Sequence, residues 1–85
     1  MSNKNKDTMT VVVNGVPTEV TFNKNAPLHT IVPEALRETG NSGPPERWEI
    51  KDQAGNLLDG NKKIEDFKFP DNVTLFLSLK AGVGG

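Results

Sequence analysis

The first apolar residues of the chain are arranged as in a pair of strands. Residues 8–13 are rich in β-branched side chains, and residues 19–22 alternate polar with apolar side chains. Asn14-Gly15 lies between the two segments, and this dipeptide is typical of a tight hairpin turn. Pro17 opens the second segment, where its missing N–H does least harm to a strand. We therefore predict a β-hairpin over residues 8–22.

The period of the apolar residues changes between residues 28 and 39. Apolar side chains recur there at spacings of three and four, which places them on one face of a helix, with His29 on the polar face. Gly40 supplies the left-handed residue that commonly ends a helix. Pro33 costs about 3 kcal/mol inside a helix, so we predict an irregular first turn or a bend near His29. The predicted buried positions are Leu28, Ile31, Val32, Ala35 and Leu36.

The segment after the helix contains two loops around a strand. Residues 41–45 carry Gly and Pro at the density of a loop, and residues 52–56 carry the residues of a turn. Between them, residues 47–51 alternate as in a strand that points Trp48 and Ile50 inward.

Short elements follow this strand. Leu57-Leu58 is long enough only for a very short strand, and Asp59-Gly60 turns the chain again. Residues 62–67 are predicted to form one helical turn. Its Ile64 and Phe67 are three residues apart, so both can face the core.

The last apolar run, residues 73–79, is predicted to be the final strand. Its inward residues would be Val73, Leu75, Leu77 and Leu79, with Thr74, Phe76 and Ser78 on the other face. The order of elements predicts an α+β fold. In it, one helix packs across a mostly antiparallel sheet, and a long return crossing lets the last strand lie parallel beside the first.

Neither end of the chain has an apolar run that would anchor it. Residues 1–7 are polar and charged, so we expect a disordered lead-in. Residues 80–85 hold three glycines, and a thin, bendable chain that enters a narrow channel in another protein would need that composition. A frayed terminus or a cloning remnant explains the tail alone equally well.

Composition narrows the classes of function. The 85 residues make one domain, and the net charge of −1 with scattered basic residues does not favour nucleic acid as a partner. Because the chain has no cysteine, disulfides, thiolate metal sites and a cysteine nucleophile are excluded. No segment resembles a secretory signal or reaches the length of a membrane span, so we expect a cytoplasmic protein. We also expect a monomer.

These features together resemble ubiquitin and its relatives, the β-grasp proteins. Leu58-Asp59-Gly60, followed by Ile64, Asp66 and Phe67, is similar to the corresponding ubiquitin stretch, and the closing strand and Gly84-Gly85 complete the likeness. The resemblance implies a β-grasp domain over residues 8–79 and a flexible diglycine tail over residues 80–85. The chain also resembles bacterial ubiquitin-like proteins that accompany activating and conjugating enzymes and a JAMM-type metalloprotease.

The resemblance implies a protein modifier that is not itself an enzyme and needs no cofactor or metal of its own. An activating enzyme would use ATP to adenylate Gly85 and pass it to a cysteine as a thioester. A target lysine would then attack and form an isopeptide bond, which a JAMM-type or other isopeptidase could cleave. Gly84 and Gly85 would be the conjugation residues. The tail read by the partners would comprise Lys80, Ala81, Gly82 and Val83.

The chain also departs from ubiquitin in places that matter for recognition. The arginine near the end of the ubiquitin tail corresponds here to Ala81, or to Lys80 if this tail is one residue longer. The apolar patch on the ubiquitin sheet falls on Glu49, Phe76 and Ser78, of which only Phe76 is apolar. Phe76 is either the anchor of a partner-specific surface or a side chain half-covered by its neighbours.

The remaining candidate residues have structural interpretations. His29 has no second ligand at metal spacing, and Trp48 is expected in the core. Asp59, Glu65 and Asp66 form an acidic cluster of the kind that turns and helix starts attract for capping.

Two other functions remain open at this point. A sulfur carrier also ends in Gly-Gly and is adenylated, but then forms a C-terminal thiocarboxylate. A non-conjugated ubiquitin-like interaction domain would use its surface and not its tail. Fold alone does not decide between these functions.

Overall fold

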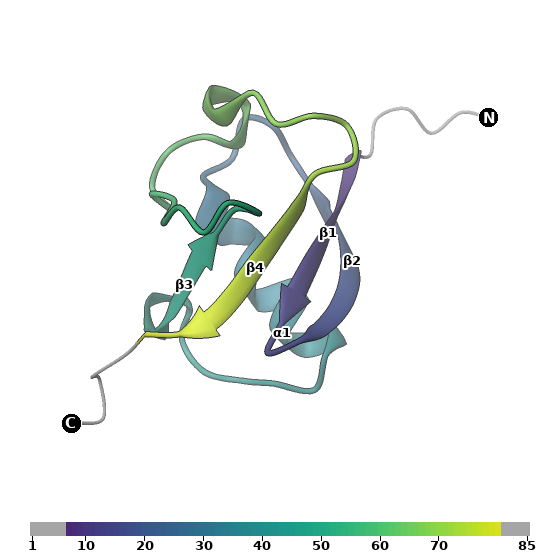
Figure 1. Cartoon of the computed structure of the whole chain (residues 1–85), viewed down its shortest axis with the longest axis vertical. Helices are drawn as coiled ribbons and strands as arrows, with labels where there is room; N and C mark the ends of the chain where they lie inside the picture. The colour runs from purple at the N-terminus through teal and green to yellow at the C-terminus, as the bar shows by residue number, and fades with distance from the viewer. Residues whose placement is uncertain (1–6, 81–85) are drawn as a thin grey trace.

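A four-stranded sheet with one α-helix across it forms the domain in a computed structural model that describes residues 7–80. The strands are β1 (Asp7–Val13), β2 (Val16–Phe22), β3 (Trp48–Lys51) and β4 (Thr74–Leu79), and the helix is α1 (Val32–Glu38). Their order in the sheet is β2-β1-β4-β3, with β1 and β4 parallel and the other pairs antiparallel. Figure 1 shows the sheet in front of α1, with the start of β1 and the end of β4 at opposite ends of the domain. The predicted α+β architecture, with the last strand parallel to the first, is confirmed.

The predicted hairpin is present, and its turn explains its sequence. Asn14 and Gly15 both have positive φ, 50° and 86°, as a two-residue type I′ turn requires. β2 is an edge strand, and Val13↔Val16 closes the turn, so the main chain at Pro17 faces the open side of the sheet. The missing N–H of Pro17 therefore removes no ladder hydrogen bond. β1 begins at Asp7, which pairs with Phe22, so the prediction that Asp7 belongs to a disordered lead-in is wrong.

The predicted helix is divided at its proline. A 3₁₀ turn, η1 (Leu28–Ile31), precedes α1, and Pro33 lies in the first turn of α1, where its missing N–H has no helical partner to lose. This confirms the irregular first turn near His29. Thr39 Oγ1 donates to Ala35 C=O (2.9 Å) at the helix end, and Gly40 follows with a φ of 75°.

The core lies between α1 and the inner face of the sheet. All five apolar helix positions predicted to be buried are buried, and so are Val73, Leu75 and Leu77 from the last strand and its approach. Leu79 was also predicted to point inward, but it is 55% exposed. It is the last residue of β4 and lies past Leu77, where the pairing of β4 with β1 ends, so alternation alone overestimates its burial.

The long crossing from β3 to β4 is tied back to the start of the helix. Leu28 N–H donates to Lys62 C=O (2.9 Å), and Ile64 N–H donates to Ala26 C=O (3.0 Å). A second short 3₁₀ turn, η2 (Pro45–Arg47), precedes β3, and η3 (Ile64–Phe67) lies in the crossing. η3 buries Ile64 and packs Phe67 against the core as predicted. The predicted strand at Leu57-Leu58 is only a single bridge between Lys51 and Leu57, because the chain turns away at once. No helix among residues 7–80 is long and apolar enough to cross a membrane.

Candidate functional site

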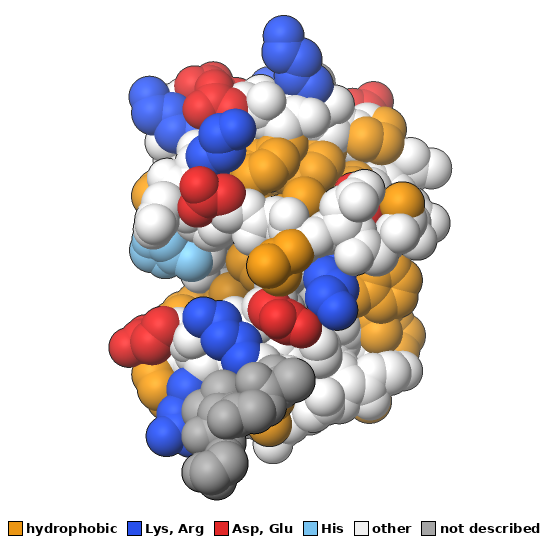
Figure 2. Space-filling model, turned by 60° about the vertical axis from the view of Figure 1, so that its left-hand side comes forward, with side chains coloured by type: hydrophobic (Ala, Val, Ile, Leu, Met, Phe, Trp, Pro, Cys, Tyr) orange, Lys and Arg blue, Asp and Glu red, His pale blue; other side chains and the backbone are white. Residues whose placement is uncertain are grey.

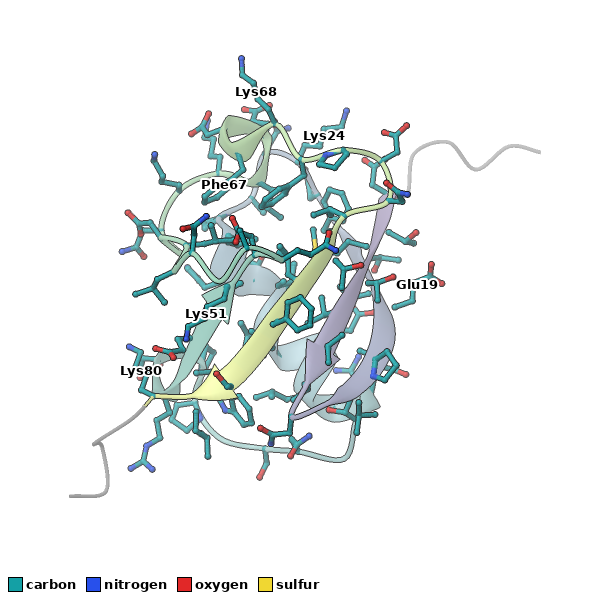
Figure 3. All side chains as sticks on the ribbon, viewed as in Figure 1. Glu19, Lys24, Lys51, Phe67, Lys68 and Lys80 are labelled. Atoms are coloured by element: carbon teal, nitrogen blue, oxygen red, sulfur yellow. The ribbon has the colours of Figure 1, made fainter. Side chains whose placement is uncertain are left out.

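The residue that precedes the predicted conjugation residues in the sequence is held at the end of β4. Lys80 N–H donates to Arg47 C=O (3.0 Å), and the preceding Leu79 pairs with Trp48. The described domain thus includes Lys80, one residue beyond the predicted domain end. The predicted conjugation and tail residues, Ala81, Gly82, Val83, Gly84 and Gly85, lie outside the described residues. Figure 3 shows Lys80 next to the end of β4.

The three predicted surface residues lie together on the face of the sheet opposite α1. Glu49 on β3 pairs with Ser78 on β4, and Phe76 pairs with Lys51 in the neighbouring row. Lys51 Nζ lies 3.4 Å from Glu49 Oε2, an exposed ion pair that contributes at most about 1 kcal/mol. Phe76 is 37% exposed, which leaves a substantial part of its ring in contact with solvent.

The strand register adds two apolar residues that the sequence did not indicate. Phe76 pairs with Val12 across the parallel β1–β4 junction, and Val12 pairs with Pro17 on β2. With Lys51, these residues form one row across all four strands. Neighbouring side chains in such a row contact one another, so Phe76 has apolar neighbours. We call Lys51, Phe76, Val12 and Pro17 the front row. Its composition depends on the register between β1 and β4, which the long crossing determines, so the sequence alone does not indicate it.

A groove of about 540 Å³ lies at the β3 edge, beside the point where the tail leaves. One wall is the turn that contains Leu57 and Gly60, and the other includes Pro45 and Lys80. Gly60 is packed against His29: an added Cβ would lie 3.2 Å from His29 Cβ, and His29 N–H donates to Gly60 C=O (3.0 Å). Figure 2 shows this side of the molecule hollowed, with hydrophobic side chains inside the hollow and charged ones around it.

One acidic residue of the crossing has a structural partner. Asp59 Oδ1 accepts from Asn61 N–H (2.9 Å), which confirms a turn-stabilising role for Asp59. Glu65 and Asp66 lie in the first turn of η3, but η3 has no side-chain capping hydrogen bond, so capping by these two residues is not observed. Residues 7–80 contain no group of three or more His, Cys, Asp or Glu side chains placed to hold a metal ion. Trp48 is buried as predicted, and its Nε1–H has no protein partner within the described chain.

Asp52 organises the turn that follows β3. Its Oδ1 accepts from the N–H groups of Asn56 and Ala54 (both 2.9 Å), and its Oδ2 accepts from Asn56 Nδ2 (3.1 Å). The main-chain N–H of Asn56 is the largest cause that lowers the pKa of this carboxyl below its ordinary value, and the Asn56 side chain is the next. The turn therefore depends on the charged form of Asp52.

Replacing Asp52 by Asn is expected to remove a pH-dependent part of the stability. Because the folded-state pKa is lowered, the carboxylate stabilises the fold above the unfolded-state pKa of about 3.9, and this contribution is lost as pH falls through the folded-state pKa. Urea unfolding between about pH 6 and pH 2 should show wild type losing its advantage over Asp52→Asn at the acid end. In an Asn56→Ala background this pH dependence should become smaller but persist, because the variant loses only the Nδ2 bond and keeps the main-chain N–H bonds of positions 54 and 56 to Asp52. An advantage that is the same at both pH limits would contradict this account.

The fold is similar to that of solved ubiquitin structures. The ubiquitin of Caldiarchaeum subterraneum is 19% identical to this chain, and the two match with a TM-score of 0.70 over 94% of this chain and 99% of that one. A de novo design based on ubiquitin is 18% identical and matches with a TM-score of 0.75 over 98% and 99%. At such identities the likeness establishes the ubiquitin-like β-grasp fold, and function must be argued from the surface.

Sequence relatives place the chain in a family. The "Uncharacterized protein y4jI" of Sinorhizobium fredii (strain NBRC 101917 / NGR234) is 59% identical over 76 residues, which are 88% of this chain. The match spans 58% of that relative's length. The family described as "Protein of Unknown function (DUF2604)" matches residues 2–85, close to the whole chain. This protein therefore belongs to the DUF2604 family and has a ubiquitin-like β-grasp fold.

Proposed function

We propose that this chain is a ubiquitin-like protein modifier that is joined to target amines through the carboxyl group of Gly85. One observation carries the proposal. The described ubiquitin-like domain includes Lys80, whose N–H donates to Arg47 C=O, and Ala-Gly-Val-Gly-Gly follows Lys80 in the sequence. Five extended residues reach about 17 Å, enough to present the last carboxylate to an active site while the domain stays outside.

The chemistry that this proposal requires takes place in partner enzymes. The Gly85 carboxylate attacks the α-phosphorus of ATP in an activating enzyme, and pyrophosphate leaves. A cysteine thiolate then attacks the acyl carbon and AMP leaves, which gives a thioester. A lysine amine of the target attacks in turn, the thiolate leaves, and the deprotonated nitrogen forms an isopeptide bond. A conjugating enzyme and a deconjugating isopeptidase of the JAMM or another type complete the set of partners.

In this proposal the partner enzymes bind both the front row and the tail. Phe76 with Val12 and Pro17 gives the partners an apolar contact, and Glu49 and Ser78 border it with polar groups. Lys80 begins the tail that enters the activating enzyme. The arginine of the ubiquitin tail corresponds here to Ala81 or Lys80, so we expect an activating enzyme dedicated to this modifier.

The test is a search for the remnant that trypsin leaves on targets. The chain, with an N-terminal tag, is expressed in its native host and purified under denaturing, reducing conditions, so that isopeptidases cannot act. Trypsin cuts after Lys80, and each target lysine should then carry Ala-Gly-Val-Gly-Gly. Intact mass of the unconjugated protein shows in the same experiment whether it ends at Gly85.

The same sample separates the proposal from the two other functions. A sulfur carrier would give no remnant, and its intact mass would show one oxygen replaced by sulfur. A non-conjugated interaction domain would give neither the remnant nor the sulfur. Either of these results overturns the modifier proposal.

A further inference from the structure

One edge of β3 pairs with β4, and its other edge lies at the margin of the sheet. On the β4 side, Arg47 C=O accepts from Lys80 N–H, so in an antiparallel ladder the main chain of Trp48 and of Ile50 faces the opposite edge. At that edge Ile50 C=O accepts from Leu58 N–H (2.8 Å). The edge is therefore closed at one end by the turn after β3.

Two main-chain groups stay open on this edge. Trp48 N–H donates to Pro45 C=O at the end of η2, but Trp48 C=O and Ile50 N–H have no hydrogen-bond partner within residues 7–80. This acceptor and this donor flank Glu49. An extended segment that lies beside β3 would donate an N–H to Trp48 C=O and accept from Ile50 N–H with its own C=O.

The groove beside this edge has an apolar floor. Val32, Trp48 and Ile50 are buried and line it, and Leu58 is half-buried. Leu57 stands at the side of the groove with 65% of its surface exposed, the largest exposure among the large hydrophobic residues of the described chain. Aliphatic side chains of a bound segment would remove this surface from water, at about 25 cal/mol for each Å² buried.

The charges around the floor are mostly negative. Glu46, Glu49 and Asp59 line the groove with carboxylates, and Lys80 is the only lysine or arginine among the lining residues. Glu49 also pairs with Lys51, so Glu46 and Asp59 leave the rim negative. A segment with positive side chains complements this rim, and one with negative side chains is repelled by it.

We infer that the β3-edge groove binds an extended protein segment in which basic side chains alternate with aliphatic ones. The segment's main chain pairs with Trp48 C=O and Ile50 N–H, its aliphatic side chains cover the apolar floor and Leu57, and its basic side chains lie toward Glu46 and Asp59. This site differs from the front row, and its existence does not depend on conjugation through Gly85.

The test uses the whole chain and two synthetic peptides. Acetyl-Val-Lys-Val-Arg-Val-amide is titrated into ¹⁵N-labelled protein, and the acid counterpart acetyl-Val-Glu-Val-Asp-Val-amide serves as control. The basic peptide is expected to shift the amide signals of Ile50, Leu58 and Gly60 and to slow hydrogen exchange at Ile50 N–H. Reversal of two charges should weaken binding about tenfold, since each exposed ion pair contributes about 0.2–1 kcal/mol.

A matched pair of variants separates the groove from general attraction. Glu46→Gln removes a groove carboxylate and should weaken binding of the basic peptide about two- to fivefold. Glu19→Gln removes an exposed carboxylate on β2, at the opposite edge of the sheet, and should leave it unchanged (Figure 3). The inference is overturned if millimolar basic peptide leaves Ile50 unshifted, or if the shifts map to Val12 and Phe76. Equal affinity for the two peptides, or an equal loss in the two variants, would overturn it as well.

Discussion

A chain that lacks Gly85 is expected to form no conjugates in its native host while it folds as the full chain does. The acyl carbon of Gly85 is the atom that must bond to phosphate, then sulfur, then nitrogen. After deletion, the carboxylate of Gly84 takes its place about 3.5 Å short of the reacting groups. A displacement of about 1 Å can cost roughly 100-fold in rate, so a full residue should abolish the reaction.

The measurement is the count of target lysines that carry the tryptic remnant, which for this variant would be Ala-Gly-Val-Gly. Thermal unfolding is measured in parallel, because the described fold ends at Lys80 and its midpoint should not change. Conjugates formed by the shortened chain at the wild-type level would show that Gly85 is not the reacting residue.

Replacing Leu75 by alanine should lower the free energy of unfolding by about 2–5 kcal/mol. Leu75 is completely buried on β4, paired with Val11 on the central neighbouring strand. Truncation loses the transfer free energy of the side chain and leaves a cavity that the sheet and α1 cannot fill. Since domains are stable by only about 5–15 kcal/mol, a small domain such as this one would lose a large fraction of its stability.

Urea unfolding followed by fluorescence is suited to this measurement, because Trp48 is the single tryptophan and is 5% exposed in the folded state. Phe76→Ala, one position further along the same strand, is the matched control. Its side chain faces the front row, so we expect less than half the effect of Leu75→Ala. Equal losses for the two variants would show that the front of the sheet is covered in solution.

Much of the fold could be predicted because its local signals agree with one another. Asn14-Gly15 determines the hairpin turn, and the spacing of the apolar residues determines the helix. Pro33 indicates where the helix becomes regular. These features depend on residues close in sequence, and tertiary packing did not override them.

The predictions that were wrong concern residues at the ends of elements. Leu79 alternates as an inward residue, yet it lies past the end of the pairing between β1 and β4 and is exposed. The very short strand expected at Leu57-Leu58 is present only as one bridge, between Leu57 and Lys51. Sequence periodicity gives the direction of a side chain, but it does not show whether another element lies above it. Asp7 was wrongly assigned to the lead-in because it is polar, whereas its place in β1 depends on its pairing with Phe22 across the hairpin.

The two surfaces were only partly predictable. Phe76, Ser78 and Glu49 could be named from the family resemblance, but the neighbours of Phe76 depend on the register of β1 against β4. The groove depends on the pairing of His29 with Gly60 and of Leu58 with Ile50. Such contacts join residues far apart in the chain, and no local pattern indicates them.

The parallel junction between β1 and β4 also determines how the domain responds to mechanical load. The described chain enters at the start of β1 and leaves at the end of β4, so traction on its two ends slides these strands past each other. All the hydrogen bonds between them are then loaded at once. Traction at position 7, in β1, and at position 72, in the exposed turn just before β4, would instead open the bonds one after another. Because the chain has no native cysteine, engineered cysteines can attach handles at either pair of positions. Single-molecule pulling should then give a higher rupture force for positions 7 and 80 than for positions 7 and 72, and equal forces would contradict this. A protein with this topology resists being pulled lengthwise through a narrow pore, such as the entrance of an unfolding machine, more strongly than its modest size suggests.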